Sequence, residues 1–258
     1  MTFSDLYYLD SELYASFQYG FTRSLTVGFY FPYRYRLSGG DETIQSWGIG
    51  DIEFNATYQL YQSPKKHAEN AVAFSTKFPS GNTRALNDSG SLELPLGNGQ
   101  YEWTAGLHNR LHIGDKTHIT FDADYRYRIP AVAEYLVVTL IDETYQLDIA
   151  NSTIDFGDQL TGVAGVQFDL FDFLTIGSQF WGIYQFKTTI DETPMSSSDG
   201  YIIYAVPSIQ FHVSDDILLH IESSVPLYGW RYPVVSLADV VSLVPKYGLQ
   251  LGFELRFK

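Results

Sequence analysis

The last stretch of the chain, residues 246–258, reads KYGLQLGFELRFK. Every second position holds a large apolar residue, and the positions between them are small, polar or charged. The apolar positions are Tyr247, Leu249, Leu251, Phe253, Leu255 and Phe257. Because successive side chains of a strand point to opposite faces, this alternation predicts a β-strand with one apolar face and one polar face.

Four residues of this strand also form a recognisable pattern. Gln250, Gly252, Leu255 and Phe257 are spaced as polar-x-Gly-x-x-apolar-x-aromatic, which resembles the C-terminal assembly signal of bacterial outer-membrane β-barrels. Lys258 departs from that pattern, because it moves the aromatic residue away from the last position. The resemblance implies a barrel that is inserted by the barrel assembly machinery and contacts the lipid bilayer and lipopolysaccharide.

The composition narrows the class of protein. A chain of 258 residues is long enough for one large all-β domain, and we expect residues 1–258 to form a single barrel. The absence of cysteine excludes disulfides and thiolate metal sites, and a net charge of −14 argues against a nucleic-acid partner. The 20 tyrosines and 18 phenylalanines fit the aromatic girdles of membrane barrels. No apolar run approaches the ~18 residues that a spanning helix needs, so strands must cross the membrane.

The beginning of the chain bears on its location. Met1 is followed by polar and aromatic residues, whereas a secretory signal has a basic and then an apolar segment. We therefore expect that a signal peptide has been removed and that the protein is located in the bacterial outer membrane.

The same alternation recurs along the chain and predicts eleven strands. These are residues 11–19, 25–36, 49–61, 71–78, 101–113, 118–128, 160–169, 174–187, 201–213, 217–227 and 247–257. Short turns alternate with long loops, as in outer-membrane barrels, where the short turns are periplasmic and the long loops extracellular. Such barrels normally have an even number of strands, so a short first strand at residues 3–8 would make about twelve. The predicted fold is all-β, a single transmembrane antiparallel β-barrel.

Three stretches carry a resemblance to a family. They are QYGFTRSLTVGFYFPY at 18–33, GIGDIEFNATYQLY at 48–61 and FSTKFPSGN at 74–82. They resemble the outer-membrane transporter family named for the MetA pathway of phenol degradation. The resemblance lies mainly in the residues that mark turns and strand ends, over the first third of the chain. The resemblance implies a barrel that moves small, hydrophobic or aromatic molecules across the outer membrane. It identifies no substrate.

The polar faces of the predicted strands would line the lumen. The candidate lumen residues are Arg34, Asp51, Glu53, His108, Arg110, His112, Asp122, Asp124, Arg126, Arg128, Glu222, Glu254 and Arg256. They could form a charged constriction that sets selectivity, or a salt-bridge network that holds a narrow barrel together. Because the two signs of charge are interspersed, we expect no strong anion preference.

Apolar residues in two loops predict a gate. Leu136, Val137, Val138, Val241 and Leu243 lie in predicted extracellular loops, where exposed apolar side chains need to be buried. They could line the barrel mouth and capture an apolar solute. Alternatively, residues 135–141 extend a strand above the membrane and residues 236–244 form a small capping helix.

No cofactor, resident metal ion or enzymatic activity is predicted. His108 and His112 are roughly 13 Å apart along a strand, which is too far for a metal pair. Residues 129–186 contain carboxylates and no basic residue, so weak calcium binding in these loops is conceivable beside the interpretation as a solvated acidic loop. No Gly-x-Ser-x-Gly motif or triad spacing supports a barrel hydrolase.

Two functions remain open from the sequence. The first is a channel or transporter for small molecules. The second is a scaffold barrel with a plugged lumen that binds a partner protein. Uptake of small solutes by vesicles that carry the barrel would separate them.

Overall fold

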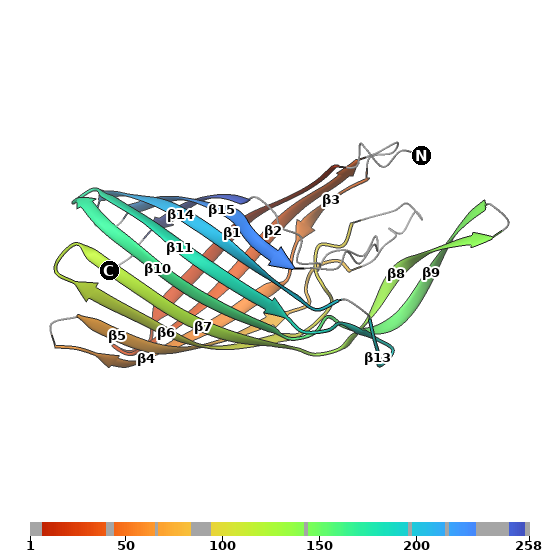
Figure 1. The fold of residues 1–258 in the computed structure, drawn as a ribbon, viewed down its shortest axis with the longest axis horizontal. Coiled ribbons are helices and arrows are strands. Elements are labelled where there is room, and N and C mark those ends of the chain that lie inside the picture. The colour runs from red at the N-terminus through yellow and green to blue at the C-terminus, as the bar shows by residue number, and fades with distance from the viewer. Residues whose placement is uncertain are drawn as a thin grey trace.

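The computed structural model describes residues 7–39, 44–64, 67–83, 94–141, 144–195, 198–214, 217–230 and 248–255. Within these ranges the chain forms tilted antiparallel strands that curl into an elongated barrel (Figure 1). In this part of the chain, no helix is long and apolar enough to cross a membrane.

Eleven strands follow one another around the curled sheet, each paired antiparallel with the next. They are β1 (Tyr7–Gly20), β2 (Leu25–Gly39), β4 (Ile52–Gln62), β5 (Ala68–Phe78), β6 (Glu102–Ile113), β7 (Thr117–Arg128), β10 (Gln159–Phe171), β11 (Leu174–Gln185), β14 (Gly200–Ser214), β15 (Ile217–Trp230) and β16 (Gly248–Leu255). Each corresponds to one of the eleven strands predicted from the alternation, so the fold class is confirmed. The twelfth strand of this sheet, β3 (Ile44–Ile49), pairs with β2.

Two predicted strand boundaries are wrong. The strand expected at 49–61 is split: β3 ends at Ile49, and β4 begins at Ile52. Gly50 lies in the break and donates its N–H to the Pro32 carbonyl at 2.9 Å. Tyr7 and Tyr8, which we expected in a separate short strand, instead continue β1 opposite the end of β2.

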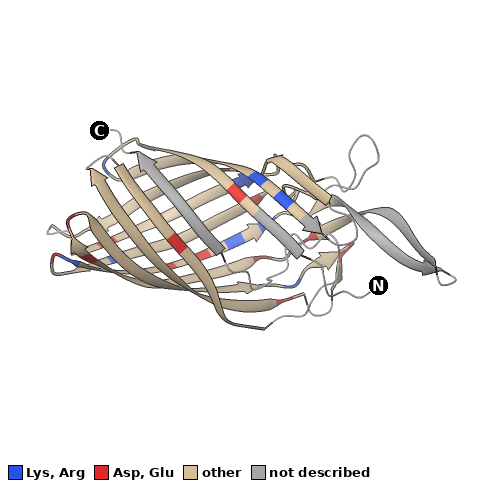
Figure 2. Cartoon of the chain, turned by 90° about the horizontal axis from the view of Figure 1, so that it is seen from above, with Lys and Arg blue, Asp and Glu red and all other residues tan. Residues whose placement is uncertain are grey.

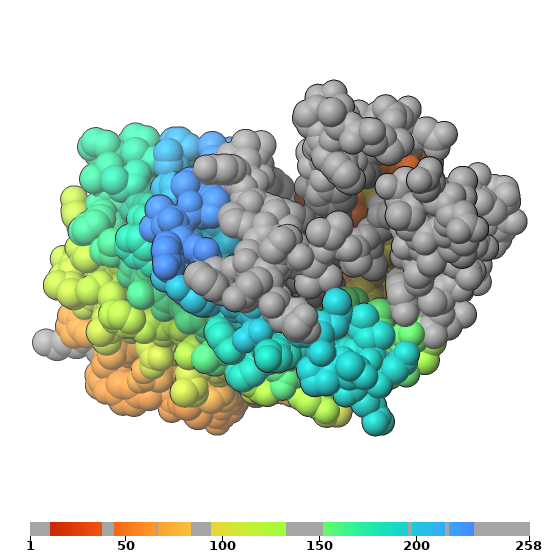
Figure 3. Space-filling view, turned by 45° about the vertical axis from the view of Figure 1, so that its right-hand side comes forward, coloured from red at the N-terminus to blue at the C-terminus, as the bar shows by residue number. Residues whose placement is uncertain are grey.

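The long segment between β7 and β10 forms a hairpin that projects beyond the barrel (Figure 1). Its strands are β8 (Ala131–Ile141) and β9 (Thr144–Asp155). The short strands β12 (Thr189–Ile190) and β13 (Thr193–Pro194) complete a separate four-stranded sheet and protrude at the rim in cyan (Figure 3). Residues 135–141 therefore belong to a strand that projects beyond the barrel. Residues 236–244, which the same alternative expected in a capping helix, lie outside the described residues.

The two faces of the barrel strands differ in chemistry. On β2, Phe29 and Tyr33 expose 46% and 48% of their surface on one face, whereas Pro32 and Arg36 on the other face are buried. The apolar face points outward and the polar face inward, which is the arrangement that a lipid-embedded barrel requires. Figure 2 shows acidic and basic residues of the described strands interspersed rather than separated into two sectors.

Candidate functional site: the lumen and its inserted segment

A segment of the connection between β5 and β6, residues 94–100, lies inside the barrel against the inward face of β2. Arg36 donates through Nη1 to the Pro95 carbonyl, and Arg34 donates through Nη1 to the Leu96 carbonyl at 3.4 Å. Arg34 was predicted as a lumen residue, and the structure places it in contact with this inserted segment. The sequence predicted a loop between the strands at 71–78 and 101–113. It did not predict that part of this loop lies inside the barrel.

Asp51 anchors the inserted segment. Its Oδ1 accepts a hydrogen bond from the backbone N–H of Gly81 at 3.1 Å, and its Oδ2 accepts one from the backbone N–H of Asn98 at 3.0 Å. Gly97 lies so close that a Cβ atom there would overlap the Asp51 carboxyl group. Asp51 is buried, so its carboxylate holds the segment in place by accepting the buried N–H of Gly81 and the partly buried N–H of Asn98.

The inserted segment also reaches the opposite side of the mouth. The Asn98 side chain donates to Glu102 at the start of β6, and the Gln100 side chain donates to the Ile154 carbonyl of β9 at 2.7 Å. Gln100 is completely buried. The hydrogen bonds of the segment therefore reach from β2 to β6 and β9, at the end where the long loops lie.

Glu102 is the centre of a buried ion cluster. Its carboxylate lies 3.0 Å from Lys77 Nζ, 3.1 Å from Arg128 Nε and 3.6 Å from Arg126 Nη1, and Glu102 is only 2% exposed. Arg128 also donates through Nη1 to the Gly157 carbonyl at 3.0 Å. The structure thus brings together two predicted lumen residues, Arg126 and Arg128, as partners of one carboxylate. Such a cluster stabilises the wall as well as lining the lumen.

Lys77 and Glu102 were missing from the predicted set, although a signal for them existed. In the sheet register, Lys77 lies opposite both Glu53 and Glu102, and Glu102 lies opposite Arg128. Inward residues of opposite charge on neighbouring strands are expected to pair. The register between β4, β5 and β6 had to be known before this row of residues could be recognised.

Further along β6 and β7, three predicted residues meet. His108 Nε2 lies 3.2 Å from Asp124 Oδ1, and His108 Nδ1 lies 3.9 Å from Asp122 Oδ1. Asp122 also accepts the backbone N–H of Asn109 at 3.2 Å. This part of the lumen wall is acidic, whereas the cluster around Glu102 carries an excess of cations.

A third polar contact lies on β1 and β2. Arg34 Nε is 2.6 Å from Glu12 Oε2, and both side chains are 28% exposed. Tyr30 donates its hydroxyl to the other oxygen of Glu12. Glu12 was missing from the predicted set, although it lies directly opposite Arg34 in the register.

The wall formed by β10, β11 and β14 differs from the charged wall. Trp181 on β11 lies between Val163 on β10 and Tyr204 on β14, and Ile183 lies opposite Ile202 in the next inward row. These residues share the inward face with the polar residues near the turns of the same strands. The lumen wall therefore has charged pairs on β6 and β7 and an apolar, aromatic patch on the adjoining strands, which the sequence analysis did not predict.

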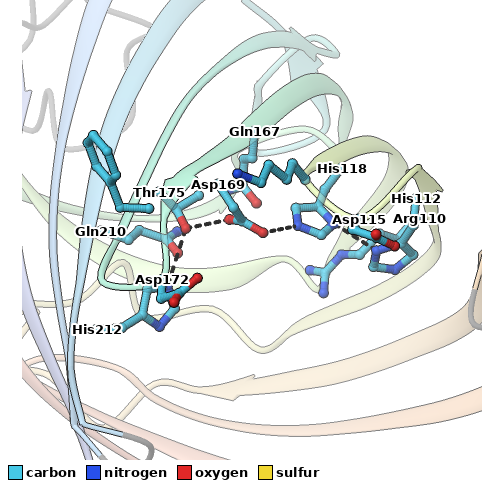
Figure 4. A pocket seen from close by; sticks show the side chains of 12 residues that line it. Arg110, His112, Asp115, His118, Gln167, Asp169, Asp172, Thr175, Gln210 and His212 are labelled. Carbon is cyan, nitrogen blue, oxygen red and sulfur yellow. Dashed lines mark hydrogen bonds and ion pairs between the residues drawn. The ribbon is translucent and has the colours of Figure 1, made fainter.

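Two other predicted lumen residues, Arg110 and His112, line a cavity of about 460 Å³ at the end where the short turns lie (Figure 4). His112 contacts His118 of β7 through their Nδ1 atoms at 2.7 Å. The cavity also contains Asp169, Thr175 and His212, which sequence reasoning missed because they come from three other strands.

The remaining predicted residues occupy less informative positions. Glu53 and Glu222 lie on inward positions of β4 and β15. Glu254, Gln250, Gly252 and Leu255 lie in β16, where the backbone pairs with β15, and Leu136, Val137 and Val138 lie in β8. Arg256, Phe257, Val241 and Leu243 lie outside the described residues. The gate, the assembly signal and the lumen roles stay predictions.

Metal binding was also considered. Among the described residues, no group of three or more His, Asp or Glu side chains is arranged to hold a metal ion. Two carboxylates of the suggested calcium region, Asp142 and Glu143, lie outside the described residues. Calcium binding in the loops therefore stays a prediction.

The fold was compared with known proteins. No protein-family profile and no curated protein sequence matches this chain. The COG4313 outer membrane channel from Pseudomonas putida F1 superposes with a TM-score of 0.69 and 13% sequence identity, over 96% of this chain and 82% of that chain. The NanC porin superposes with a TM-score of 0.52 and 10% identity, over 98% and 97% of the two chains. This chain therefore has the antiparallel barrel fold of outer-membrane channels.

Proposed function

We propose that this protein is a bacterial outer-membrane channel that passes small molecules through a lumen narrowed by residues 94–100. The observation that carries the proposal is the inserted segment itself, which Asp51 and Glu102 hold across a polar lumen. A segment held at this position selects solutes by size without closing the whole barrel. The similarity to one structure described as a channel and another described as a porin supports the same function.

The proposal includes the surroundings of the barrel. The outward apolar face fits a lipid bilayer, with lipopolysaccharide in the outer leaflet and the short turns on the periplasmic side. Assembly would depend on the barrel assembly machinery, which reads the C-terminal strand. No chemical step is part of this function, so the protein is not proposed to be an enzyme.

The composition of the lumen wall supports a class of substrate. Val163, Trp181 and Tyr204 offer an apolar and aromatic surface, and the adjoining wall of β6 and β7 carries paired charges. A small solute with an aromatic group would lose less hydration along such a path than in an all-polar pore, because its apolar part contacts apolar side chains. We therefore propose small aromatic or apolar molecules as the substrates.

An uptake assay tests both parts of the proposal. Vesicles that contain the protein are given methyl glucoside or phenyl glucoside, two neutral solutes that differ in the aromatic ring. The expected result is uptake of both, with faster entry of phenyl glucoside. Trp181→Ala should reduce that preference, whereas Phe180→Ala, on the exposed outward face of the same strand, should leave it unchanged.

The outcomes separate the two claims. Equal rates for the two solutes, or a preference that Trp181→Ala does not change, would contradict the aromatic substrate class. No uptake of either solute would contradict the channel function.

The scaffold function is the second candidate, because the buried hydrogen bonds of residues 94–100 would also suit a permanent plug. A plugged barrel would conduct no ions as it stands, and would conduct only after the anchor at Asp51 is removed. Conductance of the unaltered protein in planar bilayers would therefore exclude the scaffold function as the sole role.

A further inference from the structure

The cavity at the short-turn end contains more titratable groups than the channel function uses. It lies inside the barrel, beside the turns that join β6 to β7 and β10 to β11. Two cations, Arg110 and Lys116, face three carboxylates, which are Asp115, Asp169 and Asp172. Three histidines, His112, His118 and His212, complete its charged lining.

Five of the lining residues form a continuous chain, each from a different strand (Figure 4). His112 Nδ1 lies 2.7 Å from His118 Nδ1, and His118 Nε2 lies 2.8 Å from Asp169 Oδ2. Thr175 donates its hydroxyl to Asp169 Oδ1 at 2.6 Å, and His212 Nε2 lies 3.2 Å from the same hydroxyl oxygen. The chain therefore crosses β6, β7, β10, β11 and β14.

The contacts determine where the protons lie when the histidines are neutral. Because the Thr175 hydroxyl proton goes to Asp169, His212 must donate from Nε2 to the Thr175 oxygen. Because ionised Asp169 only accepts, His118 carries its proton on Nε2. His118 Nδ1 is then an acceptor, so His112 donates to it from Nδ1.

This order leaves two ring nitrogens available for further protons, Nε2 of His112 and Nδ1 of His212. His112 Nε2 is buried and has no hydrogen-bond partner among the described residues, and Glu69 Oε1 of β5 lies 4.0 Å from it. A proton on this nitrogen leaves the contact between His112 and His118 intact and places a positive charge near Glu69. A later proton on His118 Nδ1 would remove the acceptor of that contact, so the chain takes up protons in steps.

Other titratable groups lie next to the cavity. His67, in the turn before β5, accepts the backbone N–H of His112 through its carbonyl at 2.8 Å. On β15, His220 lies opposite Gln210 in the register, and Glu222 lies two residues further along that strand. His67, His220 and Glu222 border the cavity rather than line it, so the cavity's own charge depends mainly on its three histidines.

Protonation reverses the sign of the cavity's charge. With the three histidines neutral, two cations and three carboxylates give a formal charge of −1, and three added protons change it to +2. Imidazole side chains take up protons as the pH falls, so the reversal is expected on acidification from neutral pH. Charges that line a narrow pore set the relative permeability of cations and anions.

We infer that this cavity is a proton-controlled ion filter, which favours small inorganic cations at neutral pH and loses that preference when His112, His118 and His212 take up protons. The inference rests on the proposed channel function, because a filter requires a conducting lumen. It adds a selectivity site at the end opposite to the inserted segment.

The test measures the reversal potential of the protein in planar bilayers under a KCl gradient. For the unaltered protein, the ratio of K⁺ to Cl⁻ permeability is expected to fall by about threefold or more between pH 7.5 and pH 5.0. In the triple variant His112→Gln, His118→Gln, His212→Gln, the ratio should stay nearly constant. His220→Gln, which removes a bordering histidine, should keep the full pH response.

A second variant covers the case in which the triple variant does not fold. Asp169→Asn retains all three histidines but removes one carboxylate, so it should lower the permeability ratio already at pH 7.5. A pH response that survives in a folded triple variant, or an Asp169→Asn ratio equal to that of the unaltered protein, would overturn the inference. Absence of any conductance would overturn the channel function itself, and the filter with it.

Discussion

Asp51 and Asn98 are 47 residues apart in the chain, yet the Asp51 carboxylate accepts the backbone N–H of Asn98 at 3.0 Å. The second oxygen of the same carboxylate accepts the backbone N–H of Gly81. One buried side chain thus ties two points of the β5–β6 connection to the start of β4. The proposed narrowing of the lumen by residues 94–100 rests on this attachment.

Removing the anchor should widen the channel. In Asp51→Ala, the buried N–H of Gly81 and the partly buried N–H of Asn98 lose their acceptor. A buried unsatisfied group costs about 1–3 kcal/mol, which favours release of residues 94–100. We expect a larger and noisier single-channel conductance from a barrel that still folds. Glu192→Gln, which removes one carboxylate from an exposed turn at the rim, should leave the conductance unchanged. An unchanged conductance in folded Asp51→Ala would show that the segment does not limit flow.

A methyl group at Gly97 should have a similar effect by a steric route. The added Cβ of Gly97→Ala would overlap the Asp51 carboxyl group, so the segment must move. We expect the conductance to change in the same direction as in Asp51→Ala. Gly162→Ala is the matched control, because a Cβ at Gly162 meets nothing within 4 Å. Equal conductances for the two glycine variants would contradict close packing at Gly97.

The ion cluster around Glu102 should contribute strongly to stability. Glu102→Ala leaves Lys77, Arg126 and Arg128 without their shared carboxylate, and breaking a buried pair from one side typically costs about 3–5 kcal/mol. The free energy of unfolding in urea should fall by an amount of this order. Glu12→Ala removes a more exposed partner of Arg34 and should cost less than about 1 kcal/mol. Similar losses in the two variants would argue against a stabilising role for the cluster.

A charge on the outward face should be poorly tolerated in lipid. Leu107, in the middle of β6, is 54% exposed on that face, and an arginine at the bilayer midplane of a barrel costs about 2–4 kcal/mol. We expect Leu107→Arg to lower the yield of folded protein in bilayers. Thr161→Arg is the inward control, because Thr161 lies opposite Asp124, which can pair with the new charge. If Leu107→Arg folds in bilayers as well as Thr161→Arg, the assignment of the two faces is wrong.

The barrel strands were predictable because their signal is local. Alternating apolar and polar residues in 118–128 and 201–213 reflect a period of two that any strand with two different faces must show. The hairpin of β8 and β9 was harder to predict, since its sequence is apolar and then acidic rather than alternating. Gly50 also split a predicted strand, because its backbone N–H bonds to Pro32 of the neighbouring strand.

The candidate site was predictable in part. His108, Asp122 and Asp124 lie on a hairpin whose register follows from one short turn, so their proximity could be inferred. Asp169, Thr175 and His212 joined the cavity through strands whose neighbours were not known from the sequence.

By itself, the sequence determined that the chain forms strands with an apolar outward face, because side-chain alternation is a property of each strand. It also predicted that the polar residues of each strand face the lumen, although several of the residues that meet there were missing from the predicted set. Only the tertiary structure decided which of these residues meet, because the pairing of distant strands depends on their register. The same holds for residues 94–100, whose composition indicates a loop, and whose position inside the lumen depends on Asp51 and Glu102. Contacts between residues that are far apart in the chain form only when the strands that carry them pair in this order.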